Sequence, residues 1–413
     1  MDNYLNISQS SLSPDSNLVT SDYDASLDLA YIGQSTVGVA VDRFGTSLGG
    51  GVSLLFNDML GHHSLGVVAQ VNGGIKDIGG QVFYMNLEQQ INWGAGIAHI
   101  PYLTGYMNSG EAVVTIDGEQ YLARSRELIR QRVFLDRLNA MTEYPFSRNR
   151  RLEFSAGYTR ISYDVESEKI LTIGGAIVGE ERKELEAPPA LNLFQSSIAY
   201  VGDYSFLGFT SPVNGKRFRF EFEPTLGSLG YLTVIADYRH YFFLNPVTFA
   251  FRALHVGRYL KDSESRKVTP LFIGHETFIR GYSLRSTKVS QMAETSDPYV
   301  SPEFDRLVGS KIGVLNAEIR IPLIGTEQFG ILNFRYLPLE IAGFVDAGVA
   351  WTEDDRPKLN FAKESAERIP VFSTGIATRL NLFGYFVFQV YYVYPFQRPG
   401  TGAHFGFVIA PGW

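Results

Sequence analysis

Apolar and polar residues alternate with a period of two along most of this chain. In residues 217–224, RFRFEFEP, the phenylalanines fall on one side and the charged residues on the other: Phe218, Phe220 and Phe222 against Arg219, Glu221 and Glu223. Successive side chains of a β-strand point to opposite faces, so this pattern predicts a strand with one apolar and one charged face.

The same alternation recurs to the end of the chain, interrupted by Gly, Asn and Pro turn residues. It predicts sixteen strands, which begin near Tyr31, Gly51, Ser64, Gln81, Gly94, Glu127, Arg151, Ala190, Lys216, Tyr231, Val247, Lys311, Leu337, Val371, Tyr385 and Ala403. Successive strands that are joined by turns predict an all-β, antiparallel fold.

The predicted connections alternate between short and long. Short ones fall at residues 61–62, 147–149 and 245–246, and long polar ones cover 104–126, 164–189, 261–310 and 352–370. Short periplasmic turns opposite long external loops are typical of outer-membrane barrels. Hydrocarbon offers backbone groups no partners, so such a sheet is expected to close between its first and last strands. We therefore predict a 16-stranded transmembrane β-barrel with both termini in the periplasm.

One segment allows a second interpretation. Residues 127–139 contain LIRQRVFLDRL, which also fits an amphipathic helix. We favour a strand with Arg130, Arg132 and Asp136 facing inward.

Composition supports a membrane sheet and excludes several kinds of site. The 413 residues include 41 Gly, 30 Phe and 23 Tyr, while charged residues make up only 19%. The chain has no cysteine, which excludes disulfides and thiol nucleophiles, and its net charge of -7 without a basic stripe argues against nucleic acid. No P-loop, G-x-S-x-G or HExxH motif is present. We expect no enzyme activity, no metal and no cofactor.

The two ends of the chain differ in character. Residues 1–22 are polar and rich in Ser, which suggests the remnant of a linker, and we assign residues 23–413 to the barrel. The C-terminal segment HFGFVIAPGW places large apolar side chains at alternate positions, namely Phe405, Phe407, Ile409 and Trp413. Such an ending is similar to the signal by which outer-membrane barrels are recognised for insertion. Gly402, Gly406, Pro411 and Gly412 weaken this last strand, so the closing seam is expected to be poorly bonded.

Two short motifs in the second half of the chain are separated by one alternating strand. The first is IRGY, residues 279–282, and the second is FVDAG, residues 344–348. In the strand between them, Glu318 is expected to face the lumen, because a charge on the lipid side is costly. Asp346 shares that side by parity, so an Arg280 folded into the lumen would meet two carboxylates. A planar guanidinium binds such groups through parallel hydrogen bonds.

This arrangement resembles the bacterial surface antigen superfamily, of the BamA, TamA and two-partner-secretion transporter type. In that superfamily an [V/I/L]RG[F/Y] motif of the sixth external loop is tucked into the lumen. It contacts an F-x-D-x-G motif on strand thirteen and an acidic residue on strand twelve. The matching residues here are Ile279, Arg280, Gly281 and Tyr282 in the loop, with Glu318, Phe344, Asp346 and Gly348 as their lumenal partners.

The sequence also departs from that superfamily. Gly274-His275 stands where a Gly pair is common, and no POTRA domain precedes the predicted barrel. Residues 42–61 look like a subgroup in which the barrel follows a periplasmic β-propeller.

The resemblance implies a role in outer-membrane protein assembly or protein translocation, with a lumenal latch and a weak first/last strand seam. Its partners would be periplasmic or outer-membrane proteins and outer-membrane lipids, including lipopolysaccharide. The alternative is a membrane anchor or solute pore for a missing N-terminal periplasmic domain. The loop at 261–310 discriminates between them, because a loop that fills the lumen does not suit a passive pore.

Overall fold

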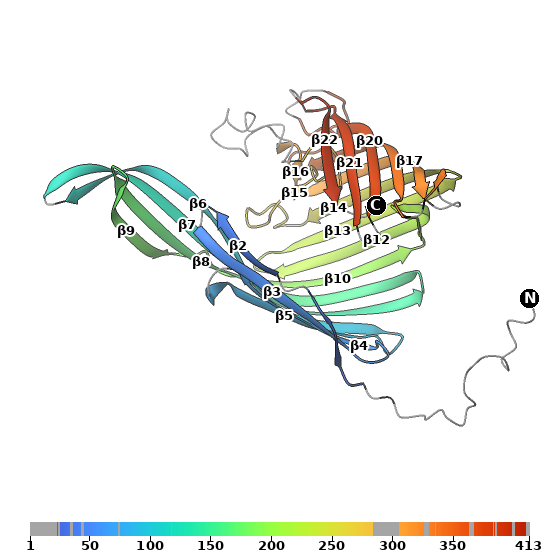
Figure 1. The fold of residues 1–413 in the computed structure, drawn as a ribbon, viewed down its shortest axis with the longest axis horizontal. Helices are drawn as coiled ribbons and strands as arrows, with labels where there is room; N and C mark the ends of the chain where they lie inside the picture. The colour runs from blue at the N-terminus through green and yellow to red at the C-terminus, as the bar shows by residue number, and fades with distance from the viewer. Residues whose placement is uncertain are drawn as a thin grey trace, which may run out of the picture.

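Antiparallel β-structure accounts for nearly all regular elements of the chain in a computed structural model (Figure 1). The structure describes residues 23, 25–33, 36–42, 45–72, 75–116, 118–283, 305–325, 330–334, 336–362, 367–382, 384, 386–398 and 401–409. The predicted linker at 1–22 lies outside these residues. In the described part of the chain no helix is long and apolar enough to cross a membrane.

The strands of the main sheet are β1 (Asp28–Ile32), β2 (Thr36–Asp42), β3 (Gly45–Asn57), β4 (His63–Asn72), β5 (Ile78–Asn86), β6 (Asn92–Ile116), β7 (Glu119–Ser147), β8 (Arg150–Ile173), β9 (Ala176–Leu185), β10 (Leu191–Asp203), β11 (Phe206–Leu207), β12 (Pro212–Gly227), β13 (Tyr231–Leu244), β14 (Val247–Tyr259), β17 (Lys311–Gly325), β18 (Leu332–Asn333), β19 (Leu339–Trp351), β20 (Val371–Leu382), β21 (Phe386–Pro395) and β22 (His404–Ile409). β15 (Leu271–Phe272) and β16 (Val308–Gly309) form a separate two-stranded sheet.

The predicted strand number fits this sheet. Of its 20 strands, β9, β11 and β18 are side branches, and β1 and β2 pair with successive parts of the same strand β3. Counting β1 and β2 as one leaves sixteen consecutive antiparallel neighbours in the described residues. β17 is then the twelfth and β19 the thirteenth, as the sequence predicts.

The sheet curves so that β20–β22 stand above β10–β13 in Figure 1. Among the described residues, β22 pairs only with β21, and β1 and β2 pair only with β3. Both outermost strands therefore present an unpaired edge. Closure between the first and last strands stays a prediction.

Strand register defines the two faces of the sheet. Arg219 pairs with Asp237, Arg239 pairs with Arg252, and the row continues through Asn316 to Asp346. We call this side the inner face. Phe218, Phe220 and Phe222 alternate with Arg219 along β12 and lie on the opposite, outer face.

Two predicted external loops are wrong. Residues 104–126 and 164–189 are mostly extended strands of β6, β7, β8 and β9, and EERKELE at 180–186 falls largely within β9. β10 stops pairing with β8 at the Leu191–Ile161 pair, so the farther parts of these strands project as an arm, at the left of Figure 1. The polar composition that suggests loops instead supplies ion pairs between neighbouring strands, which stabilise a sheet.

Residues 127–139 form a strand, but the predicted inward direction of three side chains is wrong. Leu138 pairs with Tyr158, and the row runs on to Phe194 and Leu226 on the outer face. Arg130, Arg132 and Asp136 have the same parity as Leu138 on β7, which keeps its register there, so they share the outer face. The outer face changes from apolar to charged beyond Leu138. The prediction that these three side chains face inward assumes that lipid surrounds this part of β7, where an outward charge would be costly.

Charged partners cover the outer face of the arm. Arg130 lies 2.7 Å from Glu168, and Arg132 lies 3.0 Å from Glu166. Lys76, in the short η4 turn (Ile75–Asp77), lies 2.8 Å from Glu166. The turn between β4 and β5 is thereby tied to β8.

Candidate functional site

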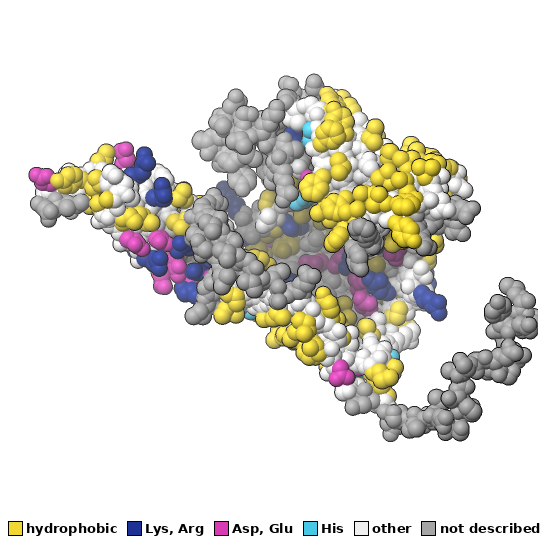
Figure 2. Space-filling view, viewed as in Figure 1, with side chains coloured by type: hydrophobic (Ala, Val, Ile, Leu, Met, Phe, Trp, Pro, Cys, Tyr) yellow, Lys and Arg dark blue, Asp and Glu magenta, His cyan; other side chains and the backbone are white. Residues whose placement is uncertain are grey.

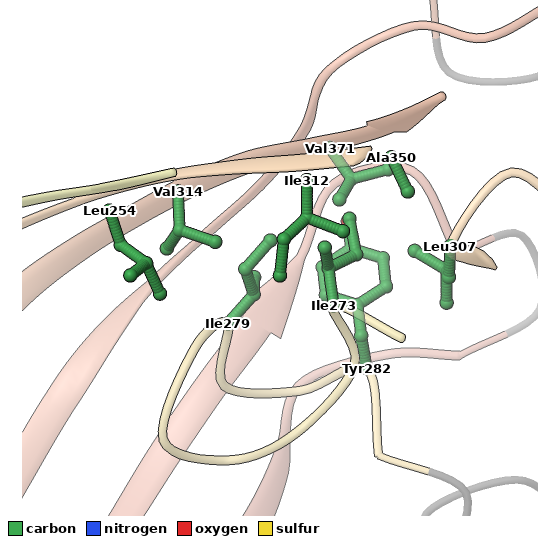
Figure 3. Close-up of a cluster of buried hydrophobic side chains, with 9 residues drawn as sticks. All are labelled: Leu254, Ile273, Ile279, Tyr282, Leu307, Ile312, Val314, Ala350 and Val371. Atoms are coloured by element: carbon green, nitrogen blue, oxygen red, sulfur yellow. The ribbon is translucent and has the colours of Figure 1, made fainter. Parts of the chain in front are cut away.

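The loop between β14 and β17 leads its IRGY segment onto the inner face of the sheet. Phe278 and Ile279 both donate backbone hydrogen bonds to the carbonyl of His275, at 2.8 and 3.0 Å, which makes a tight turn just before the motif. Ile279 is fully buried. In Figure 3 the loop residues Ile279, Ile273, Tyr282 and Leu307 pack against apolar residues of the strands, which are Leu254, Ile312, Val314, Ala350 and Val371.

Arg280 reaches both predicted carboxylates. Its Nε and Nη2 atoms donate hydrogen bonds of 2.7 Å to the two oxygens of Asp346, and its Nη1 donates one of 2.7 Å to Glu318. Its backbone N–H also donates to Asp346 at 3.2 Å. The Arg280 side chain is 3% exposed, so burial leaves the guanidinium dependent on these acceptors.

Glu318 is the centre of a larger charged network on the inner face. Besides Arg280, it accepts hydrogen bonds of 2.7 Å from Arg320 and from Arg379. Arg379 also donates to Glu340 at 2.8 Å. Each of these side chains is buried, so the network links β17, β19 and β20 to the loop. Alternating charge signs offset the cost of burying each group.

The remaining motif residues shape the space around Arg280. The guanidinium carbon lies 3.5 Å from the centre of the Phe344 ring, within the range of cation–π attraction. A Cβ at Gly348 would lie 2.3 Å from Cδ1 of Ile279, so only glycine leaves room for that side chain. Gly281 has a φ of 91°, in the left-handed region that glycine adopts readily.

Tyr282 attaches the end of the motif to the last strands. Its hydroxyl donates to the carbonyl of Phe372 at 2.9 Å and accepts from the backbone N–H of Gln397 at 3.1 Å. Arg398 donates to the carbonyl of Gly281 at 2.9 Å. The loop is therefore tied to the segments bordering β20 and β21 as well as to β17 and β19.

Three further anchors of this loop were missed in the sequence. Asn316 donates to Asp346 at 2.8 Å and to the Phe278 carbonyl at 2.7 Å. Arg252 donates to the Thr277 carbonyl at 3.0 Å, and Arg379 reaches Glu318 from β20. All three lie on the inner face, so strand parity was a usable signal for them.

The residues of the C-terminal signal lie away from this site. Phe405, Phe407 and Ile409 are exposed and lie on the outer face of β22, in the same rows as Tyr392, Val390 and Phe388. Trp413, Gly412 and Pro411 lie outside the described residues.

The site has no arrangement suited to a metal. In the part of the chain that the structure describes, no group of three or more His, Asp or Glu side chains could hold a metal ion. Guanidinium groups already occupy Asp346 and Glu318. The chemistry available here is ion pairing and hydrogen bonding.

Comparisons with known proteins return structures rather than sequence relatives. No protein-family model matches the sequence, and no curated protein matches it. The chain is similar in structure to BamA from Haemophilus ducreyi lacking POTRA domains 1–3, with 13% identity and a TM-score of 0.45 over 94% of this chain and 75% of that one. It is also similar to CdiB from Acinetobacter baumannii (14% identity, TM-score 0.43) and to CdiB from Escherichia coli (13% identity, TM-score 0.45). Those matches cover 91% and 90% of this chain, and 58% and 61% of the respective CdiB chains.

Proposed function

We propose that this chain is an outer-membrane β-barrel that acts in outer-membrane protein assembly or protein translocation. The observation that carries the proposal is the Arg280 latch: a long loop held on the inner face by Arg280 between Asp346 and Glu318. The latch would brace the inside of the sheet, while the first and last strands each have one side that pairs with no other described strand. No cofactor or catalytic group is needed for this activity.

The distribution of exposed side chains supports a membrane location. Large apolar residues are exposed on the outer face, among them Ile97, Leu138, Phe194, Phe222, Leu226, Phe251, Leu315, Ile319, Val345 and Ile376. Figure 2 shows such side chains gathered in broad patches over the sheet. Soluble proteins rarely expose large contiguous apolar patches, whereas strands that face lipid have an apolar outer surface.

Aromatic side chains mark one end of the outer face. Tyr144, Phe146, Tyr200 and Phe218 form successive ring contacts, with centroids 5.2–6.5 Å apart, beside the short turn between β7 and β8. Aromatic girdles of this kind sit at membrane interfaces. We propose that this end, with its short turns, and both termini lie on the periplasmic side of the outer membrane.

The position of the loop argues against the alternative of a passive pore. Ile279, Arg280 and Tyr282 are all buried where a solute would pass along the inner face. Breaking a buried ion pair is costly, so the loop is expected to stay in place. A loop fixed in this way fits a brace better than a channel.

The free edges supply the means to act on another protein. Among the described residues, β22 pairs only with β21, and β1 and β2 pair only with β3, so one side of each of these strands has no partner there. An unpaired strand edge is a template for adding a strand from another chain. We propose that periplasmic or outer-membrane client proteins engage these edges, with lipopolysaccharide and other outer-membrane lipids around them.

Reconstitution tests this function. The full chain in liposomes should accelerate the folding of an unfolded outer-membrane barrel client relative to protein-free liposomes, and Arg280→Ala should reduce that acceleration. Arg266→Ala, an exposed substitution in the same loop, is the matched control. Ion conductance through the wild type with no effect on the client would favour the pore.

A further inference from the structure

A cavity of about 690 Å³ lies where β14 and β19 end and β17 begins, apart from the Arg280 latch. Tyr259, Lys311 and Trp351 stand at these strand ends, and the rest of the lining is Leu260, Lys261, Ser263, Glu264, Thr352, Glu353, Arg356 and Pro357. The loop that carries the latch leaves β14 and enters β17 at this end of the sheet. The short turns lie at the opposite end. Under the membrane placement proposed above, on which this inference rests, the end with the cavity is external.

Strand register places the cavity on the outer face. Lys311 pairs with Trp351 on β19 and with Gly257 on β14. Gly313 and Leu315 follow Lys311 at alternate positions of β17, so they lie on the same face as Lys311. The next rows along the same face carry Leu315 and Val345, which are exposed. The cavity thus opens directly above an apolar, lipid-facing stretch.

The cavity carries more positive than negative charge. Its lining includes Lys261, Lys311 and Arg356 against Glu264 and Glu353. Glu264 is already engaged, because it accepts hydrogen bonds from the Ser310 hydroxyl at 2.6 Å and the Glu353 amide at 2.7 Å.

Two of the cations remain available to a ligand. Lys311 is nearly buried and lies 3.6 Å from Glu264, which balances its charge. Lys261 and Arg356 are exposed and make no ion pair with any other described residue. Both residues line the cavity, and an ammonium and a guanidinium group are suited to binding an anion.

Aromatic rings form the side of the cavity nearest the apolar stretch. Trp351 stacks on His255 with centroids 5.7 Å apart, and Lys311 lies 5.3 Å from the centre of the Tyr259 ring. Trp and Tyr are favoured at the headgroup level of a bilayer, where one side of the ring is apolar and the other is wet.

The backbone at the rim is strained. Leu260 has a φ of 78°, a left-handed conformation that is unfavourable for a residue with a bulky side chain. Strain of this kind persists where the surroundings enforce it, and it is concentrated at binding sites. Here it turns the chain so that Lys261 and Glu264 both line the cavity.

We propose that this cavity binds the phosphate of an anionic lipid headgroup. Lys261 and Arg356 contact the phosphate, Trp351 and Tyr259 flank the headgroup, and an acyl chain follows the outer face past Gly313 and Leu315. A lipid held here would fix the height of β14, β17 and β19, the strands that carry the latch, in the bilayer.

Native mass spectrometry of the full chain in detergent tests the proposal, with phosphatidylglycerol, phosphatidylcholine and inorganic phosphate as probes. The wild type should retain phosphatidylglycerol in preference to phosphatidylcholine. The variant Lys261→Ser/Arg356→Ser should bind phosphatidylglycerol at least about tenfold more weakly, since it lacks both basic side chains proposed to contact the phosphate. Arg266→Ser/Lys267→Ser removes the same charge from exposed positions of the same loop and should bind as the wild type does.

Equal retention of the two lipids, or unchanged binding by the cavity variant, would overturn the lipid site. Displacement of the lipid by an equal concentration of inorganic phosphate would show an anion site without lipid selectivity, and would overturn it too. Insertion of the same variants into liposomes, followed by protease protection, reports separately on the proposed membrane placement. Failure of the wild type to insert would contradict that placement, whereas a loss confined to phosphatidylglycerol binding concerns the cavity alone.

Discussion

Arg280 and Asp346 form a bidentate ion pair, in which Nε and Nη2 of the guanidinium each donate a 2.7 Å hydrogen bond to a different carboxylate oxygen. The Asp346 side chain is fully buried, and Asn316 occupies part of the same carboxylate. Removing the guanidinium would leave the Asp346 charge in a site closed to water. The loop conformation and the charge balance of β17 and β19 therefore depend on each other.

Arg280→Ala is expected to destabilise the folded chain by about 3–5 kcal/mol, the usual cost of removing one partner of a buried pair. Arg280→Lys should recover only part of this, since an ammonium cannot make the parallel pair of bonds. Urea unfolding in detergent micelles measures both values. Arg266→Ala serves as the exposed control, and an Arg280→Ala variant as stable as this control would show that the ion pair contributes nothing.

Gly348→Ala is expected to loosen the latch loop, because the added methyl would meet Ile279 Cδ1 at 2.3 Å. Limited proteolysis at residues 261–283 should become faster. Gly343→Ala, in the same strand, is the matched control, since a Cβ there would have no described atom within 4 Å. Adding Ile279→Val to Gly348→Ala removes the clashing carbon and should restore protection. If the double variant is cut as fast as Gly348→Ala, the clash is not the cause.

The two faces of β12 should react with different thiol reagents. The chain contains no cysteine, so single cysteines can be introduced without background. Cysteines at Phe220 and Phe222 should react with a lipid-soluble maleimide, and those at Arg219 and Glu221 with a membrane-impermeant one. Reversed labelling would contradict the assignment of the outer face to lipid.

Acid should release the η4 turn from the arm. Hydrogen bonds from Lys76 and Arg132 lower the pKa of Glu166 from 4.5 to about 2. Because the pKa in the folded state is depressed, this contact stabilises the fold above pH 4.5, and the stabilisation is lost as the pH falls towards 2. Spin labels replacing Ile78 and Ile177 should report a changed distance distribution over that range. In Glu166→Gln part of this change should already appear at pH 7, because the Lys76–Asp164 and Arg132–Asp77 pairs remain, and an identical titration in both proteins would exclude Glu166 as a cause.

The sequence predicts the strands better than their surroundings. Period-two alternation identifies sixteen strands because each alternate side chain must match one face of the sheet. The stretches at 104–126 and 164–189 are misread, since their polarity suggests loops while cross-strand ion pairs such as Arg132–Glu166 hold them as strands. Arg130 and Arg132 are placed on the wrong face because alternation alone does not show where the bilayer ends.

The candidate site is predicted in part for a similar reason. The strand pattern places Glu318 and Asp346 on one side, and the superfamily resemblance supplies Arg280 as their partner. Strand parity places Arg379 and Arg252 on the inner face but does not identify their partners: Arg379 reaches past β19 to Glu318, and Arg252 reaches the Thr277 carbonyl in the folded loop.

We propose that the unpaired sides of the first and last strands act on a client protein while the latch holds the sheet. Joining these two edges chemically should therefore block the activity. Cysteines at Ile32 in β1 and Phe407 in β22, both exposed, can be linked by a cleavable bis-maleimide, with the linkage verified by mass spectrometry. Tyr238 and Ala253, which already pair between β13 and β14, provide a linked control.

The quantity to measure is the folding rate of an unfolded barrel client in liposomes that contain each linked protein. We expect the Ile32–Phe407 link to reduce the rate to that of protein-free liposomes and cleavage of the linker to restore it, with no effect of the Tyr238–Ala253 link. If the edge-linked protein accelerates client folding as fully as the unlinked one, the edges of the first and last strands do not act on the client.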